Sequence, residues 1–194
     1  KVQNDSMRFR RNIERIGEIM AYEISQQLVF EPVEIQTPLG FKKTSKIKDS
    51  VVICSILRAG LALHNGFLNY FDDAENGFIS AYRHHPHQDD YFEITVQYQA
   101  VADINNKTVL VVDPMLASGQ SIVAVYHKLM ERGTPAEIHI AVVIAAPEAI
   151  EYLQKHLPDH CHLWIASIDE QLNEHSYIIP GLGDAGDLAY GEKL

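Results

Sequence analysis

Continuous runs of apolar residues predict strands that are buried on both faces. The runs at 51–57, 108–112 and 138–144 are rich in β-branched residues, which is typical of strands in a parallel sheet that helices cover on both sides. Residues 162–167 form a weaker run of the same kind. We therefore expect a central parallel sheet built from these segments.

Helical patterns lie before and between these strands. From Phe9 to Ile24, apolar residues recur at helical spacing with charged residues between them, and similar patterns cover 61–70, 121–132 and 147–155. Alternation of strands and helices predicts an α/β fold, a central parallel sheet flanked by helices. A length of 194 residues fits a single domain, 1–194.

Two further segments do not follow this pattern. Residues 91–99 alternate between apolar and polar side chains, and 77–82 resemble a short strand. Together they predict an antiparallel β flap or hood at about 78–100, of the kind that covers a site.

The N-terminal third contains a weaker strand pattern. Val33–Gln36 alternates like a half-buried strand, which we expect to end at Pro38 and Gly40. The Lys-rich stretch 41–49 is then expected to be a polar loop.

Charge and composition exclude several classes of protein. The 16 Lys and Arg residues stand against 26 Asp and Glu residues, for a net charge of −10. Such a chain has little from which to build the basic face that nucleic acid requires. No apolar run is long enough to span a membrane. With only Cys54 and Cys161, far apart, a reducing compartment is favoured over a disulfide framework. We expect a cytoplasmic protein that binds neither nucleic acid nor membranes.

The most informative motif is Val109–Ser121. Here a buried strand ends at Asp113, and the sequence Ser118-Gly119-Gln120-Ser121 opens a helix. Unpaired N–H groups at a helix N-terminus hold phosphate without lysine, and ligands bind at the carboxyl ends of parallel strands. The same residues would also suit an ordinary strand, loop and serine-capped helix.

Two arginines stand out in a chain with few cations after residue 50. Arg58 follows the strand 51–57, and Arg83 lies in the predicted flap. A lone arginine at a strand end is usually a surface charge, whereas two at the mouth of one sheet suit an anion clamp.

Two other motifs do not indicate sites. Gly181–Gly186 matches G-x-G-x-x-G, but a dinucleotide fingerprint must open a βαβ unit, and only eight residues follow Gly186. His84-His85-Pro86-His87, with Asp89 and Asp90, suits a solvated loop better than a metal shell.

Three motifs together resemble the uracil phosphoribosyltransferase family. They are Ile56–Leu61, Asp113–Ser121 and Tyr177–Asp187, and similarity extends over nearly the whole chain. The resemblance implies a type I phosphoribosyltransferase fold with a uracil-binding loop at 177–187. It also implies transfer of a phosphoribosyl group from phosphoribosyl pyrophosphate (PRPP) to uracil, giving UMP and pyrophosphate with Mg²⁺.

The resemblance also implies roles for individual residues. No side chain is a nucleophile, and Arg58 and Asp113 act electrostatically. The residues that would hold PRPP are Arg58, Arg83, Asp113, Pro114, Met115, Leu116, Ala117, Ser118, Gly119, Gln120, Ser121 and Asp184. The residues that would meet uracil are Ile178, Gly183, Asp184 and Ala185. No protein side chain is expected to bind the metal directly.

Departures from the family pattern leave an alternative open. The family usually has a second glycine where this chain has Gln120, and a basic residue followed by Phe-Gly where this chain has Leu188–Gly191. The alternative is a catalytically weakened relative that senses nucleotides. The resemblance further implies a homodimer or larger homo-oligomer, and GTP as a candidate effector.

Overall fold

A mostly parallel sheet forms the centre of the molecule. The computed structural model describes residues 5–84 and 93–193. The sheet runs in the order β5-β4-β3-β6-β8, with β9 and the short β7 also paired to β8. Its strands are β3 (Val51–Leu57), β4 (Glu75–His84), β5 (Glu93–Ala100), β6 (Thr108–Val112), β7 (Met115–Leu116), β8 (Glu137–Ala145) and β9 (Cys161–Ile168). The strands predicted at 51–57, 108–112, 138–144 and 162–167 are thus confirmed to within a residue at each end.

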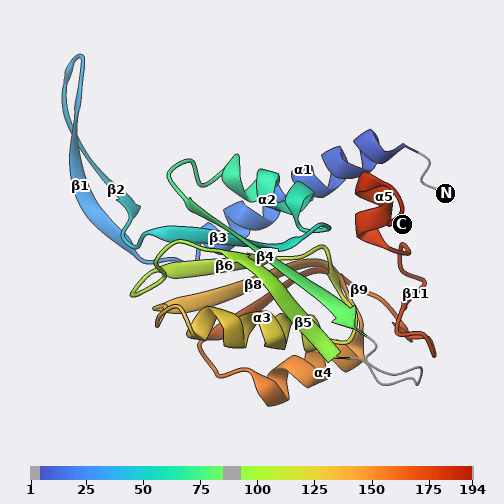
Figure 1. Cartoon of the computed structure of the whole chain (residues 1–194). Coiled ribbons are helices and arrows are strands. Elements are labelled where there is room, and N and C mark those ends of the chain that lie inside the picture. Colours follow the sequence, from blue (N-terminus) through green and yellow to red (C-terminus); the bar gives the residue numbers. More distant parts are fainter. Residues whose placement is uncertain (1–4, 85–92, 194) are drawn as a thin grey trace.

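Helices cover both faces of this sheet (Figure 1). On one face lie α1 (Ser6–Ser25) and α2 (Leu61–Leu68), with α5 (Ala185–Tyr190) beside α1; on the other lie α3 (Gln120–Met130) and α4 (Pro147–His156). Two apolar clusters follow from this layering, one on each side of the sheet. Every residue of β6 is buried, which explains its unbroken apolar sequence.

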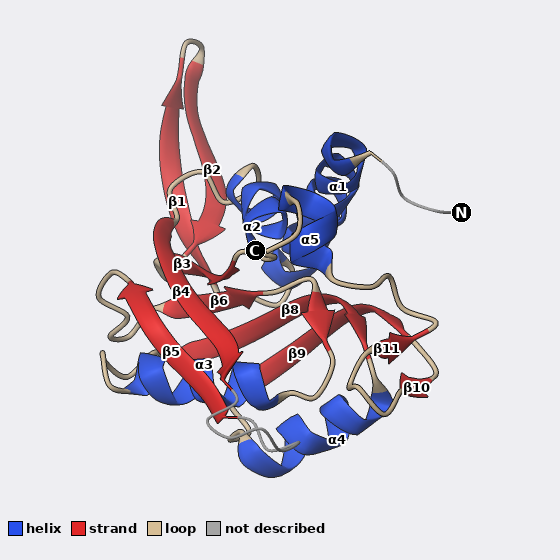
Figure 2. Cartoon of the chain, turned by 45° about the vertical axis from the view of Figure 1, so that its right-hand side comes forward, coloured by secondary structure: helices blue, strands red, loops and turns tan. Residues whose placement is uncertain are grey.

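The predicted antiparallel segment extends the sheet itself. The first part of β4 pairs in parallel with β3, and the strand then pairs antiparallel with β5. Figure 2 shows β4 and β5 as neighbouring long strands at one edge of the sheet. The strand predicted at 77–82 is therefore present and belongs to the main sheet as well. The strand predicted at 91–99 is present from Glu93, and residues 91–92 lie outside the described residues.

The expectation of a loop at 41–49 was wrong. Residues Gly40–Ile47 form β2, which pairs antiparallel with β1 (Phe30–Thr37) from Phe30↔Ile47 to Thr37↔Gly40. This hairpin projects from the body of the molecule (Figure 1). The strand expected at Val33–Gln36 is present as part of β1. Strand β2 was missed because its residues 40–46 are all exposed, so its sequence lacks the alternation that marks a half-buried strand.

The chain ends in a short hairpin and α5. Strand β10 (Gln171–Leu172) pairs with β11 (Ile178–Ile179), and the loop that follows leads into α5. No strand follows α5 within residues 5–84 and 93–193, so the glycines 181–186 do not open a βαβ unit, as the sequence predicted.

Two glycines allow α1 and α2 to cross closely, which predicts the effect of a single methyl group. A Cβ on Gly66 would lie 2.1 Å from the backbone oxygen of Glu14 and 2.9 Å from the Cα of Gly17. We expect Gly66→Ala to lower the free energy of unfolding by about 2–4 kcal/mol in urea titration, because the two backbones must separate. The exposed neighbour Asn65 provides a control, since Asn65→Ala should change the free energy of unfolding by about 0.5 kcal/mol or less. Equal values for the two variants would contradict this description of the crossing.

Candidate active site

Loops from three parts of the chain meet at the carboxyl edge of the sheet. Arg58 follows β3 and Asp113 follows β6, and these two strands are paired in parallel. A Cβ on Gly60 would lie 2.7 Å from the backbone oxygen of Val112, so the two loops touch. A Cβ on Gly186 would lie 3.7 Å from Nη2 of Arg58, which brings the C-terminal loop to the same place. The three motifs that carried the family resemblance therefore lie together at this edge of the sheet.

Arg58 is held by the C-terminal segment. Its Nη2 donates to Oδ1 of Asp187 at 2.8 Å and to the backbone oxygen of Gly191 at 3.2 Å. Its Nε is buried and has no hydrogen-bond partner among the described residues. A buried N–H of this kind is costly unless a ligand accepts its hydrogen bond. The side chain thus has an unused donor at the site.

The carboxyl group of Asp113 has a raised pKa. Burial raises the pKa of its carboxyl to about 7, with a further contribution from the charge of Asp184 and an opposing one from the Met115 N–H. That N–H donates to Oδ1 of Asp113 at 3.3 Å. The carboxyl group therefore lies where it can accept hydrogen bonds from a ligand or respond to a nearby cation.

The segment from Pro114 to Ser121 presents mostly backbone and hydroxyl groups. Pro114 and Leu116 are buried, the latter in the apolar core. Met115, Ala117, Ser118 and Ser121 are half-buried. The backbone of Gly119 has φ of +80°, a left-handed conformation that favours glycine.

Helix α3 begins directly after this glycine and has no side-chain cap. Its first N–H groups therefore stay available for an anion. Gln120 is the first helical residue and its φ is not positive. Nothing in the backbone conformation at this position requires the glycine that the family usually has there.

The predicted uracil loop is fixed by its own hydrogen bonds. The N–H of Gly181 donates to Oδ2 of Asp169 at 3.0 Å, and Asp184 caps α5 by accepting from the N–H of Asp187 at 2.9 Å. Gly183 is exposed with φ of +85°. The loop is thus built to present backbone groups in a set direction.

Two predicted uracil contacts have side chains that point elsewhere. The side chains of Ile178 and Ala185 are buried in the apolar cluster beneath α1. At these positions any contact with a ligand has to come from backbone N–H or C=O groups.

Some predicted residues fall outside this description. Arg83 lies on β4 opposite Ile94 of β5, but its side chain is not among those described. Residues 85–92 of the histidine-rich segment also lie outside the described residues. Of the two arginines of the predicted anion clamp, only Arg58 has a described side chain.

Sequence reasoning did not assign a role to two residues that contact this region. Asp187 pairs with Arg58, and Arg10 of α1 donates to the backbone oxygen of Ala189 in α5 at 2.5 Å. Arg10 is 179 residues from its partner. No local spacing could have linked them, because the contact depends on how α1 and α5 pack.

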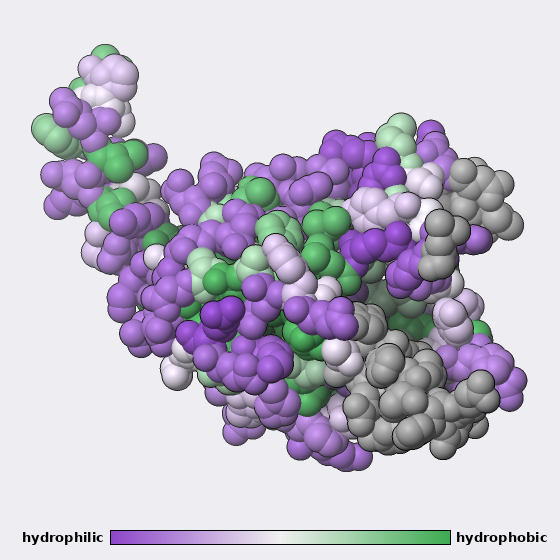
Figure 3. Space-filling view, viewed as in Figure 1, coloured by the Kyte–Doolittle hydropathy of each residue, from purple (hydrophilic) through white to green (hydrophobic). Residues whose placement is uncertain are grey.

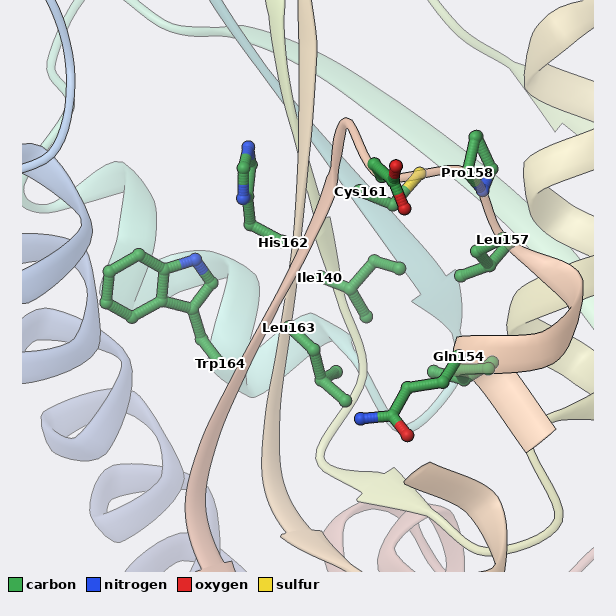
Figure 4. A pocket seen from close by; sticks show the side chains of 10 residues that line it. Ile140, Gln154, Leu157, Pro158, Cys161, His162, Leu163 and Trp164 are labelled. Carbon is green, nitrogen blue, oxygen red and sulfur yellow. The ribbon is translucent and has the colours of Figure 1, made fainter. Parts of the chain in front are cut away.

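A separate groove lies beside β9, between that strand and the end of α4. Ile140, Leu163 and Leu157 line one side of β9, and His162 and Trp164 extend on its other side (Figure 4). None of the predicted site residues lines it. The groove is therefore not part of the candidate active site.

Within the described ranges, no helix has the length and apolar character needed to cross a membrane.

Comparisons with known proteins agree with the geometry. The family model described as uracil phosphoribosyltransferase matches residues 1–192. A uracil phosphoribosyltransferase of Porphyromonas gingivalis is 52% identical over 193 residues, covering 100% of this chain and 89% of the relative. One from Pyrococcus furiosus is 38% identical, covering 98% of this chain and 82% of the relative.

Solved structures support the same fold. The AQ2163 protein of Aquifex aeolicus superposes with a TM-score of 0.90 at 28% identity, covering 98% of this chain and 89% of that one. A purine phosphoribosyltransferase of Pyrococcus horikoshii, at 17% identity and a TM-score of 0.52 over 80% of this chain and 86% of that one, shares the fold. The fold class, the resemblance and the enzyme class predicted from the motifs are confirmed: the chain belongs to the uracil phosphoribosyltransferase family.

Proposed function

We propose that the loops at the carboxyl edge of the sheet bind PRPP and uracil and convert them to UMP and pyrophosphate. The observation that carries this proposal is the meeting of Arg58, with its unused buried donor, and the C-terminal loop at one place. The uncapped N-terminus of α3 follows the adjacent strand β6 through residues 113–119. A phosphorylated sugar with an anionic leaving group needs such a set of groups.

PRPP would lie along the loops that follow β3 and β6. Its 5′-phosphate suits the N-terminus of α3, where backbone N–H groups, Ser118 and Ser121 supply donors. The ribose hydroxyls suit Asp113, whose carboxylate accepts hydrogen bonds. The pyrophosphate group suits Arg58, and Asp184 would help to place PRPP as a whole. Arg83 stays a predicted second cation.

The reaction needs positioning and electrostatics more than a nucleophile. The bond between C1 of the ribose and a pyrophosphate oxygen breaks, a bond from C1 to N1 of uracil forms, and the N1 proton passes to solvent. Positive charge develops on the sugar and negative charge on the leaving group. Arg58 would stabilise the departing pyrophosphate, and the fixed loops would hold C1 and N1 in line.

Uracil would be recognised by backbone groups at Ile178, Gly183 and Ala185. The buried side chains of Ile178 and Ala185 anchor the loop, so its N–H and C=O groups are fixed before the base arrives. Uracil presents an N3–H between two carbonyls. Cytosine reverses these groups at N3 and C4 and would leave buried groups unpaired, which costs binding energy.

Magnesium would arrive with the substrate. Among the described residues, no group of three or more His, Cys, Asp or Glu side chains is placed to hold a metal. The expectation remains that no protein side chain binds the metal directly, so Mg²⁺ would be held mainly by the phosphates of PRPP. When bound, Mg²⁺ neutralises part of the pyrophosphate charge. The chain's own contribution is to hold the anion around it.

The alternative of a weakened nucleotide sensor has little support. It rested mainly on Gln120, and this residue adopts an ordinary helical conformation at the start of α3. The predicted GTP effector and cytoplasmic location stay predictions.

Removal of Arg58 tests the proposed site most simply. We expect Arg58→Ala to lower kcat/KM for PRPP by about 100-fold or more, because a charged contact to the leaving group is lost. The exposed Arg132 provides a matched control, and Arg132→Ala should change kcat/KM for PRPP by less than about twofold. The assay follows UMP formed from labelled uracil with PRPP and Mg²⁺. UMP formation that is equal in both variants, or equal product from cytosine, would refute the proposal.

The raised pKa of Asp113 predicts how stability depends on pH. Its folded pKa, about 7, lies above the ordinary 3.8, so the folded state binds more protons between these values and stability falls as pH rises through them. Asp113→Asn keeps an acceptor for the Met115 N–H and removes this loss. From about pH 5 to about pH 8, the variant should gain about 1–3 kcal/mol in free energy of unfolding relative to the parent. Asp73→Asn, at an exposed position outside the candidate site, is the matched control for loss of a carboxyl group. A constant difference between Asp113→Asn and the parent would show that the carboxyl is not destabilised.

We also propose that the chain works as a homodimer or larger assembly, with the β1–β2 hairpin in the contact. Leu39 is 99% exposed and Phe41 72% exposed on this projecting hairpin, where hydrophobic residues alternate with polar ones (Figure 3). A two-stranded hairpin is only marginally stable in water without further packing. Sedimentation should give a dimer or larger species for the parent and for Lys43→Ser, and a smaller species for Phe41→Asp. A parent chain that stays monomeric would contradict this.

A further inference from the structure

The contact between Arg58 and Asp187 joins the two halves of the candidate site. Arg58 follows β3 in the loop that would bind pyrophosphate, and Asp187 belongs to α5 at the end of the loop that would bind uracil. Their charged groups are 2.8 Å apart across 129 residues of sequence. Both side chains are only about a third exposed, at 35% and 33%. An ion pair in this setting is screened less than one on the open surface.

Asp187 is itself held in place from both ends of α5. At the first turn, its N–H donates to the capping carboxylate of Asp184. At the last turn, the guanidinium of Arg10 donates to the backbone oxygen of Ala189 and lies 5.8 Å from the ring centre of Tyr190. Between them, Ala185 and Ala189 are buried in the apolar cluster. These contacts therefore hold α5, and with it the carboxylate that pairs with Arg58, in a defined position.

The pairing uses only part of the arginine. Nη2 donates both to Asp187 and to the backbone oxygen of Gly191, whereas Nε is buried and lacks a partner among the described residues. An arginine carries five N–H donors in one rigid plane. When one nitrogen is held by two acceptors, that plane is fixed, and so is the direction of the Nε–H bond.

We propose that Asp187 is a positioning residue for Arg58, which fixes the guanidinium so that its free donors meet the pyrophosphate. The inference rests on the proposed function, because Arg58 must contact PRPP for its orientation to matter. Asp187 does not touch the reacting atoms; it acts through Arg58. An arginine on a flexible side chain loses rotamer freedom when it binds an anion, and a partner that orders it beforehand removes that cost.

A double-mutant cycle tests this role. We expect Asp187→Asn to lower kcat/KM for PRPP by about 5–20-fold, with the KM for uracil changed by less than about twofold. In an Arg58→Ala background the same substitution should change kcat/KM by less than about twofold, because the group it positions is gone. Asp159→Asn, an exposed aspartate in the loop after α4, is the control and should have no effect in either background.

Each other outcome identifies a different failure. Equal effects of Asp187→Asn with and without Arg58 would mean that the residue only supports α5, and a parallel rise in the KM for uracil would indicate the same. A lower KM for PRPP in Asp187→Asn would mean that the carboxylate competes with pyrophosphate. Any of these outcomes overturns the positioning role, while a loss of activity in Arg58→Ala would still support the proposed function. An Arg58→Ala variant with full activity would instead refute the proposed function.

Discussion

The site depends on a sheet whose central strands are buried on both faces. Because β3 and β6 run parallel and side by side, the loops that follow them must emerge at one edge. Helices on either face leave these strands no freedom to shift. Arg58 and Asp113 are therefore brought together by strand pairing alone, before any interaction between their own side chains. Helix α5 lies beside α1 on one face of this sheet (Figures 1 and 2).

The chain has a net charge of −10, yet its proposed substrate PRPP is a highly charged anion. In the proposed function, the positive end of α3 and backbone N–H groups would provide much of the attraction, and these do not appear in a count of charged residues. Arg58 would be oriented by Asp187. The raised pKa of Asp113 reflects the same setting, in which this carboxyl group is buried and lies near the charge of Asp184.

Much of the fold could be predicted from sequence because burial leaves a regular pattern. The continuous apolar runs at β3, β6 and β8 identify strands that helices cover, and Ser118 to Ser121 correctly marks the start of α3. Only half of the hairpin β1–β2 could be predicted: Val33–Gln36 of β1 alternates between apolar and polar residues. Strand β2 could not be predicted, since its residues 40–46 are all exposed and follow no period. In the site, the motifs predicted which loops meet, and the family match supports them. They could not predict that the side chains of Ile178 and Leu116 are buried, or that Asp187 pairs with Arg58. Those facts depend on tertiary packing, and Arg58 and Asp187 are 129 residues apart in the sequence.

We propose that one site, formed by the loops after β3 and β6 and the C-terminal loop, holds both substrates. The decisive experiment is a crystal structure of the chain with uracil and a non-reactive PRPP analogue. We expect the pyrophosphate group within hydrogen-bond distance of Arg58, the 5′-phosphate at the N-terminus of α3, and uracil on the backbone of Ile178, Gly183 and Ala185. Uracil or the analogue bound elsewhere, for example in the groove beside β9, with Arg58 Nε still unpartnered, would contradict it.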